Sequence, residues 1–212
     1  MTDMALTLYR IDREHADRLL FLLHGYSAEQ HHLAAYVPLV DPGERFSAVC
    51  PRALHDLPDS DGASWWVRTA DGPEPASVLA AVDAVAALIA EECERRAVPT
   101  ERCVVGGFSQ GGMLSLALGG RAGAPRLGGV WAMCCALPAV EGLTLDLAAG
   151  AGTPALVQFG RRDPIIPVER AGAVADALRA AGWRVTQAGY DMDHSQRIEM
   201  MVDARTWLGT LA

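Results

Sequence analysis

The sequence predicts an α/β fold in which a mainly parallel sheet is covered by helices on both faces. Short apolar runs alternate with longer segments of helical periodicity along almost the whole chain, as expected when parallel strands are joined by crossover helices. The run from Leu19 to Leu23 is wholly apolar, which is typical of a central strand buried on both faces. No break in composition interrupts the chain, so residues 1–212 are predicted to form a single domain without a large inserted cap.

The individual elements follow from the spacing of the apolar residues. Strands are expected over residues 5–11, 18–23, 46–50, 103–105, 128–133, 155–159 and 184–188. Helices are expected over residues 29–40, 76–96, 110–118, 168–181 and 196–211. In the longest of them Leu79, Val82, Val85 and Ile89 recur at helical spacing. Residues 51–75 are rich in Pro, Asp and Gly, and a loop of this length in a compact domain is usually functional.

Composition excludes several classes of partner and location. The chain of 212 residues is 50% hydrophobic and carries a net charge of −8, whereas nucleic acids and anionic membrane surfaces attract clusters of Lys and Arg. Neither a signal peptide nor an apolar run long enough to span a bilayer is evident. The five cysteines are odd in number and include no Cys-x-x-Cys pair, which indicates reduced thiols. We therefore expect a cytoplasmic protein with no stable membrane association and no nucleic-acid partner.

The chain contains one Gly-x-Ser-x-Gly motif, Gly107-Phe108-Ser109-Gln110-Gly111. It lies between a predicted strand and a predicted helix, which is the context of a nucleophile elbow. In such an elbow both glycines avoid collisions at a sharp turn, and the serine hydroxyl is presented above the sheet. The alternative interpretation is a glycine-rich turn that holds an inert serine.

A serine hydroxyl becomes a useful nucleophile only beside a base whose tautomer is held by a carboxylate. Asp163 and His194 each follow a predicted strand, and ligands bind at the carboxyl ends of parallel strands. The order Ser109, Asp163, His194 is the order of the α/β-hydrolase fold. Asp191 and Asp193 compete for the role of the acid, but they are so close to His194 in sequence that they are poorly placed to reach its ring. Taken singly, Asp163 could be a capping residue and His194 a surface histidine.

The segment His24-Gly25-Tyr26 follows the central strand, where a second oxyanion donor arises in such enzymes. We assign the backbone N–H groups of Tyr26 and Gln110 to the oxyanion hole. His24 is interpreted as a packed histidine that holds its loop through hydrogen bonds.

Two other chemistries compete with a serine nucleophile. A metal site would draw on some of His24, His31, His32, His55, Asp56 and Asp59. His31 and His32 are adjacent on a predicted helix and point in different directions, so they do not easily share one ion. Cys134 and Cys135 lie near the predicted active edge, but no histidine lies close to them in the chain. Neither a metal nor another cofactor is therefore predicted.

Several segments together resemble the phospholipase/carboxylesterase family of α/β-hydrolases, which includes carboxylesterases and acyl-protein thioesterases. The matching segments are residues 22–25, Gly107-Phe108-Ser109-Gln110-Gly111-Gly112, Ala136-Leu137-Pro138, residues 160–167 and His194. The resemblance implies a small hydrolase without a cap or a metal that acts on esters or thioesters and is commonly a homodimer. Three pairs depart from the family pattern, namely Tyr26-Ser27, Trp65-Trp66 and Cys134-Cys135.

We therefore predict a serine hydrolase that cleaves carboxylic esters of short to medium acyl chains through an acyl-enzyme on Ser109. Its apolar wall is predicted to include Trp65, Trp66, Met113, Leu137 and Ile165. A thioesterase or lysophospholipase, a lactonase similar to dienelactone hydrolases, and a non-enzymatic binding relative are the alternatives. The last of these is expected to carry a broken triad, which this sequence does not have.

Overall fold

The computed structural model describes residues 6–58 and 60–211, and a mainly parallel sheet forms its centre. In chain order, the strands of this sheet are β1 (Leu8–Ile11), β2 (Arg18–Leu23), β3 (Phe46–Pro51), β8 (Cys103–Phe108), β9 (Gly129–Met133), β10 (Pro154–Gly160) and β11 (Arg184–Tyr190). In space the order is β1-β3-β2-β8-β9-β10-β11. β1 pairs antiparallel with β3 at one edge, and the remaining pairs are parallel.

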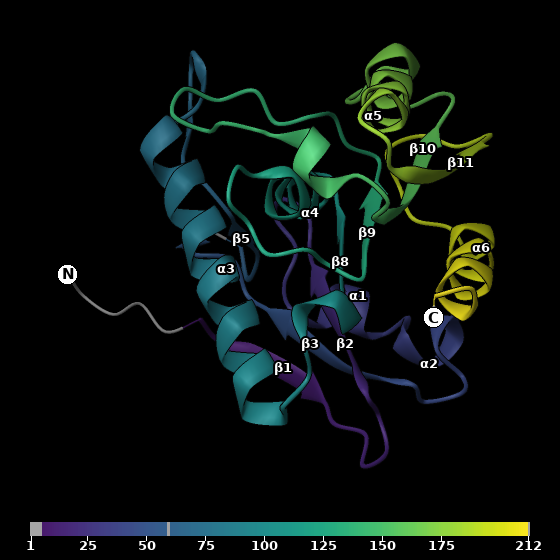
Figure 1. The fold of residues 1–212 in the computed structure, drawn as a ribbon. Coiled ribbons are helices and arrows are strands. Elements are labelled where there is room, and N and C mark those ends of the chain that lie inside the picture. The colour runs from purple at the N-terminus through teal and green to yellow at the C-terminus, as the bar shows by residue number, and fades with distance from the viewer. Residues whose placement is uncertain (1–5, 59, 212) are drawn as a thin grey trace.

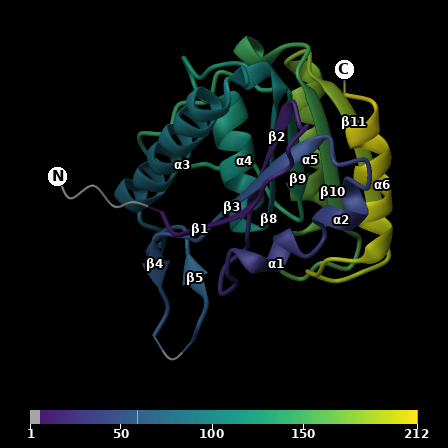
Figure 2. The same ribbon diagram turned by 90° about the horizontal axis from the view of Figure 1, so that it is seen from below.

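Helices cover both faces of this sheet, as the sequence predicts (Figures 1 and 2). They are α1 (His31–Ala34), α2 (Val37–Val40), α3 (Pro75–Arg96), α4 (Gln110–Gly120), α5 (Val168–Ala180) and α6 (Ile198–Gly209). Residues of α3, α4 and α5 pack with Leu19, Phe21 and Leu23 of β2 in one core. Residues of α1, α2 and α6 pack with Leu20 and Leu22 of the same strand in a second core. Because side chains alternate between the faces of a strand, this division explains why β2 is apolar at successive positions.

Three expectations about individual elements need correction. The helix predicted over residues 29–40 is two short helices, α1 and α2, because Pro38 in the first turn of α2 has no N–H to donate to the preceding turn. The loop of residues 51–75 contains two small hairpins, β4 (His55–Asp56) with β5 (Ala63–Ser64), and β6 (Arg68–Thr69) with β7 (Gly72–Pro73). The first strand is shorter than predicted, and its expected first residue, Ala5, lies outside the described residues.

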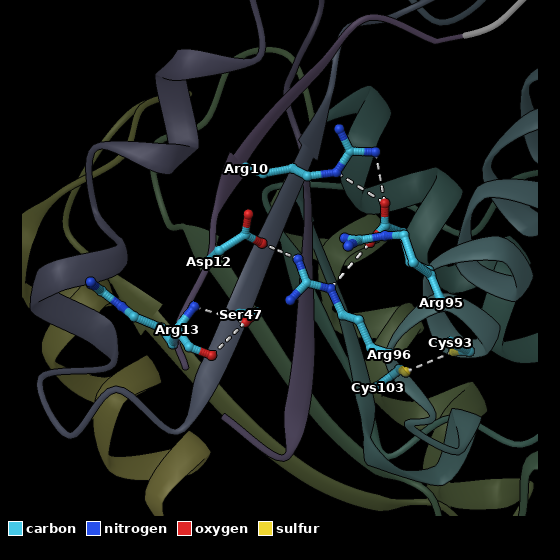
Figure 3. A network of polar contacts seen from close by, with 9 residues as sticks. Arg10, Asp12, Arg13, Ser47, Cys93, Arg95, Arg96 and Cys103 are labelled. Atoms are coloured by element: carbon cyan, nitrogen blue, oxygen red, sulfur yellow. Dashed lines mark hydrogen bonds and ion pairs between the residues drawn. The ribbon is translucent and has the colours of Figure 1, made fainter. Parts of the chain in front are cut away.

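An ionic cluster ties the antiparallel edge strand β1 to the end of α3 (Figure 3). Glu92 of α3 is buried, and its carboxylate accepts hydrogen bonds from Arg10 of β1 and from Arg95 and Arg96 of its own helix. Burial acts to raise the pKa of Glu92, but the three guanidinium groups outweigh it and hold this pKa below its ordinary value. The cluster is therefore a charged contact between β1 and the long helix.

Across residues 6–58 and 60–211, no helix combines the length and the apolarity that crossing a bilayer requires.

Candidate active site

Four loops of the site begin at the same edge of the sheet. β2 leads into His24-Gly25-Tyr26, β8 into Ser109, β10 into Asp163 and β11 into His194. These four strands run parallel, with Leu23 in register with Gly107 and Gly160 in register with Tyr190. Their carboxyl ends therefore meet at one edge, which is where open α/β sheets bind ligands.

Ser109 lies at the apex of the turn between β8 and α4. Its φ of 55° and ψ of −112° are unusual for a residue with a side chain, and such conformations cost about 1–3 kcal/mol. A Cβ on Gly107 would lie 2.2 Å from the carbonyl carbon of Gly111, and a Cβ on Gly111 would lie 1.9 Å from the Leu23 oxygen. The turn therefore requires glycine on both sides of Ser109.

Ser109, His194 and Asp163 form one chain of hydrogen bonds. Nε2 of His194 lies 2.9 Å from Oγ of Ser109, and Nδ1 lies 2.7 Å from Oδ2 of Asp163. An ionised carboxylate only accepts hydrogen bonds, so the proton of the neutral ring belongs on Nδ1. Nε2 is then free to accept the hydrogen bond of the serine hydroxyl. The ring of Phe108 packs against the imidazole with 4.9 Å between centroids.

Asp163 is held by its own loop as well as by the histidine. Its Oδ1 accepts the backbone N–H groups of Ile165 and Ile166, each at 2.8 Å, and only 1% of its side chain is exposed. Both carboxylate oxygens therefore have defined partners. The two competing aspartates are exposed, and Asp191 forms an ion pair with Arg162.

The two residues predicted to donate to an oxyanion lie just after β2 and β8, at the carboxyl edge of the sheet. Gln110 follows Ser109 directly and begins α4. Its side-chain Oε1 accepts the Trp65 N–H, which fixes this residue against the long loop. Tyr26 follows Gly25, where an added Cβ would lie 2.9 Å from the Phe108 ring. In the part of the chain that the model describes, the N–H groups of Tyr26 and Gln110 have no acceptor.

His24 is a packed residue with both ring nitrogens bonded. Nδ1 donates to the Gly25 oxygen at 2.7 Å, and Nε2 accepts the Ala53 N–H at 3.0 Å. Burial lowers the pKa of His24 to about 4. The ring is therefore neutral and links the loop after β2 to the loop after β3, in agreement with the interpretation from sequence.

The predicted apolar wall is only partly accessible. Trp65 has no exposed surface, and its indole N–H donates to the His24 oxygen at 2.8 Å. It belongs to the core rather than to the surface of a site, which corrects that prediction. Trp66 is also buried, whereas Ile165, beside Asp163, is 62% exposed. The other two predicted residues, Met113 and Leu137, are partly buried against the core beneath α4.

The residues of the rival chemistries are dispersed or inert. Burial raises the pKa of Cys134 to about 12 and raises that of Cys135 as well, which disfavours the reactive thiolate. No group of three or more potential metal ligands occurs within residues 6–58 and 60–211. Asp59, one of the candidate ligands, lies outside these residues.

Sequence reasoning missed two side chains that shape the site. Phe108 is the second residue of the motif, and its contact with His194 arises only when the loop after β11 reaches the carboxyl end of β8. Ser64 hydrogen-bonds the side-chain amide of Gln110 from the long loop. In the sequence, the only local signal for this second contact is that Ser64 directly precedes two tryptophans.

An apolar cavity of about 240 Å³ lies at the opposite end of α4 from Ser109. Ala86 and Ile89 of α3, Leu118 of α4 and the loop of residues 121–125 line it. It is therefore separate from the edge of the sheet that carries the triad.

Comparison with known proteins identifies the group to which this arrangement belongs. The model of the phospholipase/carboxylesterase family matches residues 10–212. The chain belongs to this family. The match covers all four loops at the carboxyl edge, including the family segments that the sequence analysis singles out.

One related protein and two solved structures illustrate the similarity. Acyl-protein thioesterase 1 of Gibberella zeae is 34% identical over 125 residues, which are 57% of this chain and 52% of that protein. The match thus spans about half the length of this relative. Esterase PE8 has a TM-score of 0.86 at 22% identity and covers 99% of this chain and 100% of its own. The Bacillus cereus carboxylesterase has the same TM-score at 17% identity, over 100% and 97% of the two chains.

Proposed function

We propose that this protein is a serine hydrolase that cleaves carboxylic esters through an acyl-enzyme on Ser109. The observation that carries the proposal is the continuous hydrogen-bond chain from Ser109 through His194 to Asp163. Membership of the phospholipase/carboxylesterase family supports the same reaction class.

The geometry gives each residue a role in two half-reactions. Oγ of Ser109 attacks the ester carbonyl carbon while Nε2 of His194 takes the hydroxyl proton. The N–H groups of Tyr26 and Gln110 stabilise the oxyanion that forms. His194 then gives the proton to the departing alcohol. Water, deprotonated by the same nitrogen, then attacks the acyl carbonyl. The bond to Oγ breaks, the acid leaves, and His194 returns the proton to Oγ of Ser109.

Asp163 supports both steps without taking the proton itself. Its carboxylate fixes the Nδ1–H tautomer and stabilises the imidazolium that forms when Nε2 is protonated. Because Ile165 and Ile166 hold the other carboxylate oxygen, the orientation of the acid does not depend on the histidine alone.

Thioester hydrolysis is the second candidate, and the similarity to the acyl-protein thioesterase of Gibberella zeae favours it. A thiol is a better leaving group than an alcohol, so the same residues serve without change.

We further propose short to medium acyl chains, because Met113 of α4 and Leu137 after β9 offer only partly buried apolar surface. A homodimer remains a prediction from the family resemblance. The five free, buried cysteines favour the reducing cytoplasm.

A fluorophosphonate probe tests the mechanism, because it reacts with an activated serine. It should label wild-type protein at Ser109 and leave Ser109→Ala unlabelled. Ester hydrolysis should survive EDTA. Labelling elsewhere, or activity that EDTA abolishes and zinc restores, would contradict a serine mechanism.

A substrate panel tests the specificity. We would compare p-nitrophenyl esters from acetate to palmitate, an acyl thioester and a lactone. We expect the highest kcat/KM for a short or medium ester. A rate that rises steadily to palmitate would exclude the proposed chain length, and a dominant thioester or lactone rate would favour those alternatives. A correctly folded wild-type protein without any turnover would indicate a binding relative.

A further inference from the structure

Gln158 of β10 has a buried side chain, and both its amide oxygen and its amide nitrogen form hydrogen bonds. It is 1% exposed and lies on the sheet face that α6 covers. Its Oε1 accepts the Trp131 indole N–H at 2.6 Å. Its Nε2 donates to the Tyr190 hydroxyl at 2.7 Å and to the Met200 carbonyl at 2.8 Å. Because an amide nitrogen has two protons, both donors are occupied.

The two groups that receive these protons lie on either side of His194 in the chain. Tyr190 is the last residue of β11, and Met200 lies in the first turn of α6. The loop of residues 191–197, which carries His194, joins them. The Tyr190 hydroxyl also donates to Asp203 of α6 at 2.6 Å. The Gln158 side chain therefore connects both ends of this loop to β10 through hydrogen bonds.

The backbone around Gln158 contacts the same loop. Its carbonyl accepts the Cys134 N–H at 2.7 Å, and the Cys134 sulfur lies 3.8 Å from the Ser195 oxygen. At Gly160 an added Cβ would lie 2.5 Å from the Met192 oxygen. The end of β10 therefore forms the support on which the loop lies.

We propose that Gln158 is a positioning residue, whose side-chain amide fixes the His194 loop so that the ring bridges Ser109 and Asp163. This inference rests on the proposed function. The two bonds of the ring, 2.9 Å and 2.7 Å long, leave little room for displacement. A misplacement of about 1 Å in a catalytic group costs up to ~10²-fold in rate.

The network offers matched variants for a test. Gln158→Leu removes both donors to the loop, and Tyr190→Phe removes one of them. Trp131→Phe removes a hydrogen bond from the same amide on the side away from the loop, so it is the control. The proposal predicts that Gln158→Leu lowers kcat by about tenfold or more with little change in KM. Tyr190→Phe should show a smaller fall in kcat, whereas Trp131→Phe should keep wild-type kcat even if its melting temperature falls.

A spectroscopic measurement separates this proposal from the proposed function. In wild-type protein the Nδ1 proton of His194, shared with Asp163, should give a protected downfield NMR resonance, which Gln158→Leu should broaden or remove. If wild-type protein hydrolyses no ester, the proposed function fails, but this resonance still tests the position of the loop. An unchanged resonance and an unchanged kcat in a folded Gln158→Leu variant would overturn the proposal. So would an equal loss of kcat in Trp131→Phe.

Discussion

Oδ2 of Asp163 lies 2.7 Å from Nδ1 of His194, although 31 positions separate the two residues in the chain. The pairing of β10 with β11 makes this contact, because it aligns Gly160 with Tyr190 and starts the two loops side by side. Asp191 and Asp193 are far closer to His194 in sequence, but their side chains are exposed.

Asp163→Asn should therefore lower turnover strongly while the protein stays folded. An amide in place of the carboxylate favours the wrong tautomer of His194, and the corresponding change in a serine protease costs ~10⁴ in kcat. Asp191→Asn and Asp193→Asn are the controls and should each cost far less. Near-normal turnover of Asp163→Asn, with a large loss in either control, would mean that the acid is misassigned.

His24 should make the free energy of unfolding depend on pH. Its pKa is about 4 in the folded protein because of burial, against an ordinary value of 6.5. Between these two pKa values, His24 is protonated in the unfolded chain but neutral in the folded protein. The free energy of unfolding therefore falls as the pH drops through this window. The full loss amounts to roughly 3 kcal/mol, at about 1.4 kcal/mol per pH unit.

Urea unfolding from about pH 7 to about pH 4.5 measures this dependence. His24→Gln should be less stable near neutrality, but its stability should fall less steeply with acidification than that of the wild type. His15→Gln, at an exposed position, should leave the wild-type slope unchanged. Equal slopes for the wild type and His24→Gln would contradict the role of burial.

Two glycine substitutions should act in opposite directions. In Gly111→Ala the new Cβ would lie 1.9 Å from the Leu23 oxygen, so the backbone must shift and displace Ser109. We expect loss of activity and a large loss of stability.

Gly172 lies within α5, and a Cβ there meets nothing within 4 Å. Gly172→Ala should stabilise the protein by about 0.5–1 kcal/mol, because alanine loses less backbone entropy in a helix. This corresponds to a rise in melting temperature of about 1–4 °C. Thermal unfolding of both variants gives the comparison. A tolerated Gly111→Ala with normal activity would contradict the tight turn described at Ser109.

Glu92→Gln should lower the free energy of unfolding by about 1.5–3 kcal/mol, because hydrogen bonds to charged groups contribute that much. Its carboxylate is buried and meets three arginines from β1 and α3. Asp83→Asn, which breaks an exposed pair with Arg121, should change stability by less than about 1 kcal/mol. Chemical denaturation measures both. Equal effects would mean that the buried cluster contributes no more than a surface pair.

The sequence by itself determines the elements whose causes are local. The turn at Ser109 is predictable because Gly107 and Gly111 belong to one short motif and lack the Cβ atoms that would collide there. The alternation of apolar runs with helical segments predicts the parallel sheet, because the period of the apolar residues depends only on the local backbone. The family follows from the same short segments and is confirmed over residues 10–212.

Tertiary structure decides what depends on register and packing between distant segments. Nothing local distinguishes Trp65, which is buried against His24, from a residue that lines a site. In the sequence, Gln158 is not distinguished from the other residues of a predicted buried strand. Its hydrogen-bond partners Trp131, Tyr190 and Met200 come from three separate elements. Such contacts are set by which strands pair and which helix covers them, so they arise only when the whole chain has folded.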